Sequence, residues 1–175
     1  MEKSLLQERI KISKKKNKHS QLFHTEILER KIVLPFKFIN ATLIDQLMYQ
    51  INKNFEGKCL KEGYVKSGSS EIISHTFGSV DGSDVTFHVV FRCLVCYPYE
   101  DMLINCMVES VTKIGIKAIV AKDENPVVVF ISREHNSNVD IDNYEEGDSV
   151  QVKVIGTRYE INDEYISVLG EIINE

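Results

Sequence analysis

The chain has 175 residues, of which 43% are hydrophobic and 27% are charged. These proportions are typical of folded proteins, and they allow one large or two small hydrophobic cores. The formal net charge of −5 argues against a protein that coats nucleic acid through bulk electrostatics. The chain contains no run of about 18 apolar residues, and its N-terminus lacks the apolar stretch of a secretory signal. We therefore expect an intracellular protein with no membrane partner.

Residues 1–21 form the one compositionally biased segment, because lysines crowd it. We interpret this segment as a flexible basic arm that is exposed to solvent. A nucleic-acid contact and a nuclear address are the alternative interpretations. The lysines concerned are Lys11, Lys14, Lys15, Lys16 and Lys18.

Residues 22–97 are predicted to form an α+β domain with one main helix on a small antiparallel sheet. Alternating apolar residues from Phe23 onwards indicate a strand that Pro35 ends. Two later segments, 71–77 and 84–98, are rich in β-branched and aromatic residues, and Asp81-Gly82 between them favours a turn. Pro98 and the polar residues that follow it mark the predicted domain boundary.

A single helix is predicted between these strands. Thr42 followed three residues later by Asp45 resembles a capping box, and Gly57 suits the C-terminal end of the helix or the loop beyond it. Apolar residues recur at helical spacing after Thr42, so we expect their stripe to lie in the core. The stripe consists of Leu43, Ile44, Leu47, Met48 and Ile51.

Cys93 and Cys96 form a CxxC motif, which is one half of many zinc sites. The surrounding sequence reads as one continuous strand, however, and residues three apart in a strand point to opposite faces. We therefore expect no metal site. Buried reduced thiols are the favoured interpretation for these two residues and for Cys59 and Cys106. A small zinc-bearing domain remains the alternative.

Residues 98–175 are predicted to form five short strands at residues 103–111, 115–121, 126–132, 148–158 and 165–172. Five closely spaced strands suggest a small closed barrel, and the long acidic loop between the third and fourth strands suits an oligonucleotide-binding (OB) fold. Such a fold binds its ligands on the face of its second and third strands.

The third strand of this barrel carries an aromatic residue that could contact a ligand. Alternation places Val127, Val129 and Ile131 on one face and Phe130 and Ser132 on the other. Because Ser132 is the more plausible solvent-facing residue, we expect Phe130 to point outward. A base could stack on such a ring, which is worth about 1–3 kcal/mol per base.

Four motifs follow one another along the barrel: a V–KxG turn, a VFxSR strand end, a G–V–KxxGTR strand and an I–G–I strand. Together they resemble the S1-type RNA-binding barrel and, more narrowly, the C-terminal domain of the seventh-largest subunit of RNA polymerase II and of its archaeal counterpart. The matching residues are Val111, Lys113 and Gly115; Val129, Phe130, Ser132 and Arg133; Gly147, Val150, Lys153, Gly156, Thr157 and Arg158; and Ile166, Gly170 and Ile172.

The first domain also resembles this family. Its "EG-C" segment followed by "GY" is similar to the family's tip segment, and Pro98 lies at the junction with the barrel. The likeness runs from about residue 22 to 173. Two features depart from the family pattern: residues 1–21 have no counterpart, and Ile116 stands where the family often has an aromatic residue. The bias toward lysine, asparagine and isoleucine and the loose matching indicate a divergent homologue, such as those resembling the polymerase subunits of large DNA viruses, while an archaeal or cellular eukaryotic source stays open.

The resemblance implies a non-catalytic stalk subunit of a multisubunit DNA-directed RNA polymerase. It implies docking of the tip on the polymerase core, a stalk partner similar to the fourth-largest polymerase subunit or its archaeal counterpart, and a barrel near the nascent single-stranded RNA. The location would then follow the polymerase, in the nucleus, the cytoplasm or a virion. The residues expected to dock on the polymerase are Glu56, Gly57, Cys59, Gly63, Tyr64 and Pro98.

Seven barrel residues are candidates for RNA contact, through phosphate pairing or base stacking. A solvated strand face is the alternative for Lys117 and Lys153, and pairing with Glu160 or Asp163 is the alternative for Arg158. The candidates are Lys113, Lys117, Phe130, Arg133, His135, Lys153 and Arg158.

An enzyme is not expected, and neither is a cofactor. The five histidines are scattered, without a pairing suited to metal binding or general-base catalysis. No GxxxxGK loop or GxSxG elbow is present. A free-standing S1-type RNA-binding protein in translation or RNA decay is the alternative function, although it leaves the tip-like segment unexplained.

Overall fold

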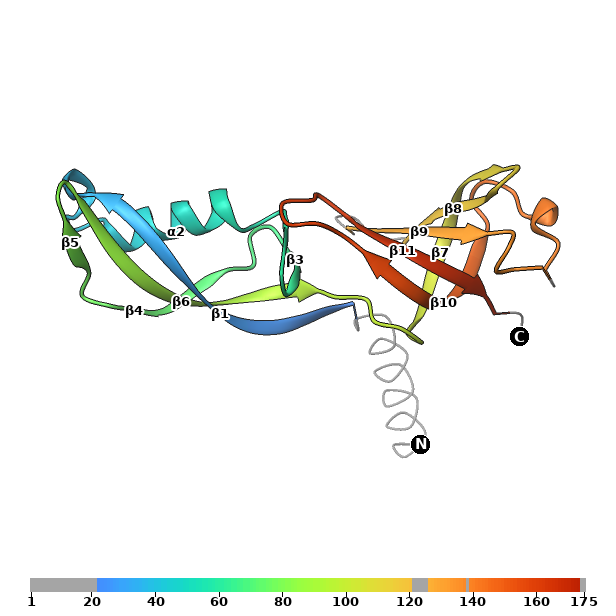
Figure 1. The fold of residues 1–175 in the computed structure, drawn as a ribbon, viewed down its shortest axis with the longest axis horizontal. Helices are drawn as coiled ribbons and strands as arrows, with labels where there is room; N and C mark the ends of the chain where they lie inside the picture. The colour runs from blue at the N-terminus through green and yellow to red at the C-terminus, as the bar shows by residue number, and fades with distance from the viewer. Residues whose placement is uncertain (1–21, 121–125, 138, 174–175) are drawn as a thin grey trace, which may run out of the picture.

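The computed structural model describes residues 22–120, 126–137 and 139–173, so the predicted arm at residues 1–21 lies outside the described residues. The chain is elongated, with a sheet and one helix at one end and a closed five-stranded barrel at the other (Figure 1). The predicted fold class, an α+β tip domain followed by an OB-like barrel, is confirmed. The domain boundaries, residues 22–97 and 98–175, stay predictions.

Two long antiparallel strands, β1 (Phe23–Pro35) and β6 (Asp84–Cys96), form the centre of the sheet. They pair over 13 residues each, from Phe23 opposite Cys96 to Pro35 opposite Asp84, and the predicted end of the first strand at Pro35 is confirmed. The other edge of β6 pairs in succession with three short strands, β5 (Ser79–Asp81), β4 (Glu71–His75) and β3 (Gly63–Val65). A further strand, β2 (Cys59–Leu60), pairs with β3.

The predicted helix is α2 (Leu43–Asn54), which follows a short 3-10 turn, η1 (Phe36–Phe38). Leu47 and Ile51 are fully buried against the sheet, whereas Ile44 is 49% exposed. The prediction that the whole apolar stripe lies in the core is therefore wrong for Ile44. One helix on a narrow sheet can bury only part of its circumference, so Ile44 faces solvent while Leu43 and Met48 are half-buried.

The predicted capping box is wrong. The Thr42 hydroxyl donates to the side-chain oxygen of Asn40 at 2.6 Å, and it accepts no capping bond from the helix. The Thr42 backbone N–H donates to the same Asn40 oxygen at 2.9 Å. Asn40 thus organises the chain before the helix, in the manner of an Asx turn.

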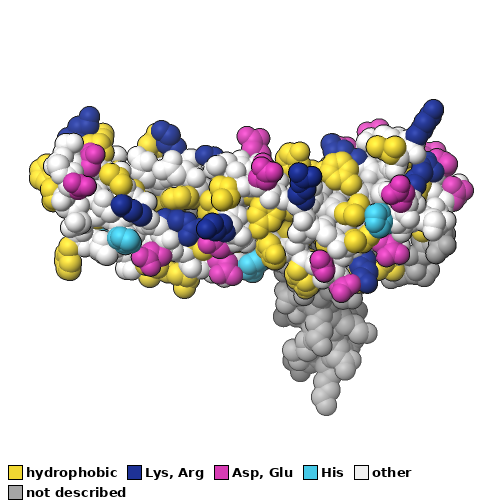
Figure 2. All heavy atoms as spheres, viewed as in Figure 1, with side chains coloured by type: hydrophobic (Ala, Val, Ile, Leu, Met, Phe, Trp, Pro, Cys, Tyr) yellow, Lys and Arg dark blue, Asp and Glu magenta, His cyan; other side chains and the backbone are white. Residues whose placement is uncertain are grey.

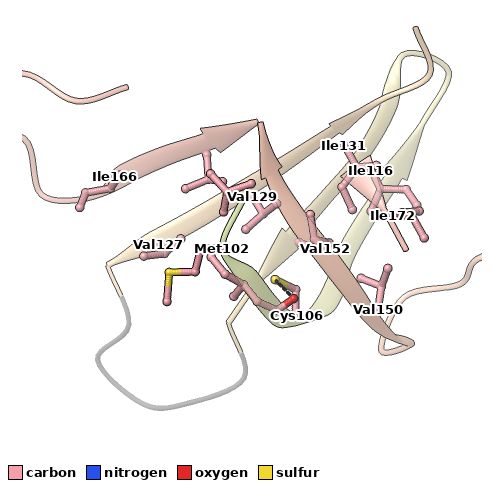
Figure 3. Close-up of a cluster of buried hydrophobic side chains, with 14 of the residues drawn as sticks. Met102, Cys106, Ile116, Val127, Val129, Ile131, Val150, Val152, Ile166 and Ile172 are labelled. Atoms are coloured by element: carbon pink, nitrogen blue, oxygen red, sulfur yellow. Dashed lines mark hydrogen bonds between the residues drawn. The ribbon is translucent and has the colours of Figure 1, made fainter. Parts of the chain in front are cut away.

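The barrel consists of β7 (Leu103–Thr112), β8 (Gly115–Ile119), β9 (Val127–Ser132), β10 (Ser149–Arg158) and β11 (Ile166–Ile172). The strands close in the order β10-β11-β9-β8-β7, and the five predicted strands are confirmed. All pairs are antiparallel except β9 with β11. Figure 3 shows the inward side chains of these strands converging on one core, with Cys106, Val129 and Val152 among them.

The long loop between β9 and β10 is attached to the barrel by buried groups. Its one-turn helix η2 (Ile141–Asn143) inserts Ile141, which is 1% exposed. The buried Asn136 amide donates to the Ser132 carbonyl at 2.8 Å, and its oxygen accepts the Ile172 N–H at 2.7 Å. A buried polar side chain satisfied in this way fixes the loop against β11.

The two cysteines of the CxxC motif lie in different cores. Cys93 belongs to the core beneath α2, whereas Cys96 belongs to the cluster that continues into the barrel. The prediction that they point to opposite faces is confirmed, because β6 is continuous through both residues. Burial raises the pKa of the Cys93 thiol to about 11 and that of Cys96 to about 12, so both are protonated at neutral pH.

The sheet and the barrel are joined by main-chain hydrogen bonds as well as by the linker. The Cys59 N–H donates to the Asp163 carbonyl at 2.8 Å, and the Asn162 N–H donates to the Cys59 carbonyl at 2.9 Å. The Tyr159 hydroxyl donates to the Lys61 carbonyl at 3.1 Å. The turn between β10 and β11, residues 159–165, therefore extends across the junction and is named here the bridging hairpin (Figure 1).

Candidate docking and nucleic-acid surfaces

Glu56 and Gly57, two of the predicted docking residues, organise the loops beside the junction. The Glu56 carboxylate accepts the backbone N–H groups of Gly68 at 2.7 Å and Ser70 at 2.9 Å. Gly57 has φ +70°, and its N–H donates to the Val65 carbonyl at 2.9 Å. A left-handed φ of this kind favours glycine, so the sequence motif has a local structural cause.

The other four predicted docking residues lie at the junction itself. Cys59 and Pro98 are buried, and Tyr64 is half-buried against the barrel cluster. Gly63 has φ +127°, and a Cβ there would collide with the Cys96 carbonyl oxygen. These residues therefore build the contact between the two parts of the chain, whereas a polymerase-docking role for them stays a prediction.

An exposed hydrophobic surface lies at the opposite end of the sheet, far from the barrel. The strand register places Val33 in the row of Thr86 and Ser79, and it places Val80 in the next row, opposite Val85. The exposed side chains therefore lie on both faces of this end of the sheet. Figure 2 shows hydrophobic side chains on this end of the molecule. We name this surface the apolar end, and its exposed side chains are Val33 (50%), Phe36 (61%), Phe38 (36%), Phe77 (fully exposed) and Val80 (66%).

The periodicity of the sequence did not predict the apolar end. Its only signal was a set of large apolar residues next to turn-forming residues, such as Phe36 after Pro35 and Phe77 before Gly78. Apolar residues clustered on the surface of a folded chain are typical of protein–protein contacts. This end is therefore the strongest candidate docking surface among the described residues.

The predicted alternation of the third barrel strand is confirmed. Val127, Val129 and Ile131 are buried, whereas the ring of Phe130 is 43% exposed on the outer surface. Ile116, on the neighbouring strand β8, is 2% exposed and lies in the core. Phe130 is thus available for stacking on this face and Ile116 is not.

Three of the five predicted RNA-binding cations form ion pairs with carboxylates. Lys117 Nζ lies 2.6 Å from Glu109 Oε2, and Lys153 Nζ lies 2.7 Å from Asp101 Oδ1. Both lysine side chains are 42% exposed, so the alternative of a solvated strand face stays open, but each lysine already has an anionic partner. A phosphate would have to compete with that partner.

Arg133 forms the third ion pair, with Asp142. Its guanidinium donates one bond to each carboxylate oxygen of Asp142, one of them at 3.2 Å. The hydrogen bond from Arg133 lowers the pKa of Asp142 and raises the pKa of Arg133 itself. This pair joins the end of β9 to η2 and so also helps to position the loop.

Arg158, Lys113 and His135 are the remaining candidates, and all three are exposed. Arg158 and Lys113 have no ion pair among the described residues. The alternative pairing of Arg158 with Glu160 or Asp163 is therefore wrong. Lys113 lies in the turn between β7 and β8, and His135 lies in the loop after β9. Of these three residues, Arg158, at the end of β10, is the closest to Phe130 in the strand register.

The barrel as a whole is acidic. Its described residues from 98 to 173 include five Lys or Arg and thirteen Asp or Glu, a net charge of −8. Such a surface repels a polyanion except where a local contact compensates. No group of three or more His, Cys, Asp or Glu within the described ranges is placed to hold a metal ion, and none of the helices there is long and apolar enough to cross a membrane.

No family model matches the chain, but several named proteins are similar to it in sequence over most of its length. DNA-directed RNA polymerase II subunit RPB7 of Glycine max is 28% identical over 178 residues, which covers 86% of this chain and 98% of that protein. The chain resembles subunit 7 of RNA polymerase II. The predicted resemblance is thereby confirmed.

Two further relatives support the same resemblance. RNA polymerase II subunit 7 of Arabidopsis thaliana is 27% identical, with the same coverage. A protein of Acanthamoeba polyphaga mimivirus, named as a candidate DNA-directed RNA polymerase subunit, is 23% identical over 172 residues, which covers 89% of this chain and 83% of that protein. The likeness to subunit 7 thus extends through both the sheet and the barrel.

Proposed function

We propose that this protein is a non-catalytic stalk subunit of a multisubunit DNA-directed RNA polymerase. The observation that carries the proposal is the similarity to RNA polymerase II subunit 7 over 86% of the chain and 98% of the relative. A match of this extent includes both domains and the junction between them. The protein would act in transcription, and its location would follow its polymerase in the nucleus, the cytoplasm or a virion.

The apolar end would dock on the polymerase core. Its side chains Phe36, Phe77 and Val80 are each more than half exposed, so a partner could bury much of their apolar area. Such burial is worth about 25 cal/mol per Å² of apolar area. The predicted residues Glu56 to Tyr64 would contribute indirectly, because they hold the sheet to the barrel.

The barrel would lie near nascent single-stranded RNA, and a stalk partner similar to the fourth-largest polymerase subunit or its archaeal counterpart would pack alongside the chain. The exposed Phe130 ring and Arg158, which has no ion pair among the described residues, support an RNA contact on the outer face of the barrel. The net charge of −8 on the described barrel residues favours a weak contact, because few phosphates could be neutralised.

Affinity capture of the tagged full chain from its native source tests the proposal. We expect large RNA polymerase subunits to co-purify with the unaltered chain and to be lost from a Phe77→Asp, Val80→Asp double variant. Ile114→Asp is the matched control, because Ile114 is 83% exposed but lies on the barrel. Capture of RNA without polymerase subunits would instead favour a free-standing S1-type RNA-binding protein.

A further inference from the structure

We propose that a groove on the outer surface of the barrel accepts one unpaired nucleobase of single-stranded RNA, and that Gly156 keeps the groove open. This inference rests on the proposed function, because it names the ligand class of the barrel surface. The groove lies between β9, β11 and β10 and has a volume of about 330 Å³. It is lined by Phe130, Gly156, Thr157, Arg158, Ser167 and Leu169.

The strand register explains how the groove is formed. Phe130 on β9 lies opposite Leu169 on β11, and Leu169 lies opposite Gly156 on β10. The next outward row places Arg158 opposite Ser167. An aromatic ring therefore stands at one side of the groove and a guanidinium near the other. Gly156 provides no side chain to fill the space between them.

The fold itself does not require glycine at position 156. Its φ is outside the left-handed region, and a Cβ added there would meet nothing within 4 Å. Gly115 in the same barrel differs, because it has φ +155° and its Cβ would collide with the Ile131 carbonyl oxygen. The open space above Gly156 is thus the consequence of a missing side chain and can be filled without disturbing the backbone.

The charges around the groove favour stacking over phosphate binding. Lys117 is the neighbour of Phe130 on β8, but it is already paired with Glu109. Arg158 is the one cation in the lining, so about one phosphate can be neutralised. Base stacking on aromatic rings tolerates any sequence and needs an unstacked base. Duplex RNA, whose bases are stacked inside the helix, would not fit this groove.

The binding test uses a fluorescent single-stranded oligoadenylate of about eight nucleotides, titrated into the full chain. We expect Gly156→Leu to weaken binding about tenfold or more, since the leucine would occupy the position of the base. Ser149→Leu is the matched control, because it adds the same side chain to the exposed surface of the same strand next to β7. Equal melting temperatures of the two variants would establish that both are folded.

A double-mutant cycle locates the effect in the groove. Phe130→Ala should weaken binding to a similar degree, and Gly156→Leu should cause little further loss in the Phe130→Ala background, because both changes remove the same stacked base. The slope of log K against log salt should be about −0.7, as expected for one phosphate on a single strand.

Three results would overturn the proposal that the groove binds a base. They are unchanged RNA affinity of the Gly156→Leu variant, no RNA binding by the unaltered chain, and a slope of log K against log salt steeper than about −2. Such a slope would mean that several phosphates are neutralised. Capture of polymerase subunits separates this failure from failure of the proposed function. The Gly156→Leu variant should retain those subunits, since position 156 lies on the barrel and not at the apolar end. RNA binding at the groove without capture of polymerase subunits would support the groove but contradict the proposed function as a stalk subunit.

Discussion

The two ends of the molecule expose aromatic rings in different surroundings. At the apolar end, Phe36 and Phe77 lie among other exposed hydrophobic side chains, whereas on the barrel Phe130 lies among ion pairs and next to a groove. A broad apolar surface suits a protein partner, and a single ring beside an open space suits a small planar ligand. Under the proposals above, protein docking and nucleic-acid contact would belong to opposite ends of one chain.

Two phenylalanines in or next to the same sheet test whether the rings of the apolar end are surface residues. Phe87 is 2% exposed and belongs to the core, so Phe87→Ala should lower the free energy of unfolding by about 3–5 kcal/mol. Phe77 is fully exposed, and Phe77→Ala should change the free energy of unfolding by less than about 0.5 kcal/mol. Urea unfolding of both variants measures the difference. A large loss for Phe77→Ala would mean that the apolar end is part of the core.

A second prediction concerns the junction between the two ends. Gly63→Ala should destabilise the chain by about 1–3 kcal/mol, because it strains a positive φ and brings a Cβ against the Cys96 carbonyl oxygen. Gly156→Ala is the control, since its Cβ would meet open space. Thermal unfolding of the two variants compares them. Equal melting temperatures would show that the backbone of β3 relaxes at no cost.

The buried thiols predict how stability depends on alkaline pH. Burial raises the pKa of Cys96 and of Cys106 from 9.0 to about 12. A raised folded-state pKa means that the stabilisation is complete below about pH 9 and is lost as the pH rises toward 12. The free energy of unfolding, measured by urea titration, should therefore fall over this range. A Cys96→Ala, Cys106→Ala variant, once corrected for its lower stability at neutral pH, should show a shallower fall.

The ion pairs on the barrel lead to the smallest expected change in stability. Asp101→Asn removes the partner of Lys153, and the loss of a solvent-exposed pair of this kind should hardly change the free energy of unfolding. The freed lysine should nevertheless steepen the salt slope of oligoadenylate binding by about 0.7. Glu171→Gln is the control, because it also removes one negative charge near Lys153 but leaves the Asp101 pair intact. An unchanged slope would place the RNA away from Lys153.

Periodicity predicted most of the fold and little of the surfaces. The strand from Phe23 to Pro35, the helix and the five barrel strands follow from alternation and helical spacing, because those patterns reflect burial. The motif at Glu56 to Tyr64 was recognised, but its position at the junction depends on the bridging hairpin, roughly 100 residues later in the chain. No local pattern carries that information.

The ion pairs could not be predicted for a related reason. A register shift between Val108 and Ser110 occurs at Glu109, the residue that pairs with Lys117. Asp101 has φ +66°, a conformation that non-glycine residues rarely adopt, and it meets Lys153 from the linker. Irregular backbone at Glu109 and Asp101 thus determines which lysines are already paired with a carboxylate. Irregularity of this kind is not visible in hydrophobic periodicity.

The bridging hairpin joins the two parts of the chain through main-chain atoms at Cys59, Asn162 and Asp163. Such bonds do not depend on which side chains the three residues carry, provided that the turn forms. Asn162 has φ +74°, a conformation that asparagine and glycine tolerate well. The relative orientation of sheet and barrel can therefore tolerate amino-acid replacement at these three positions, provided that the turn still forms.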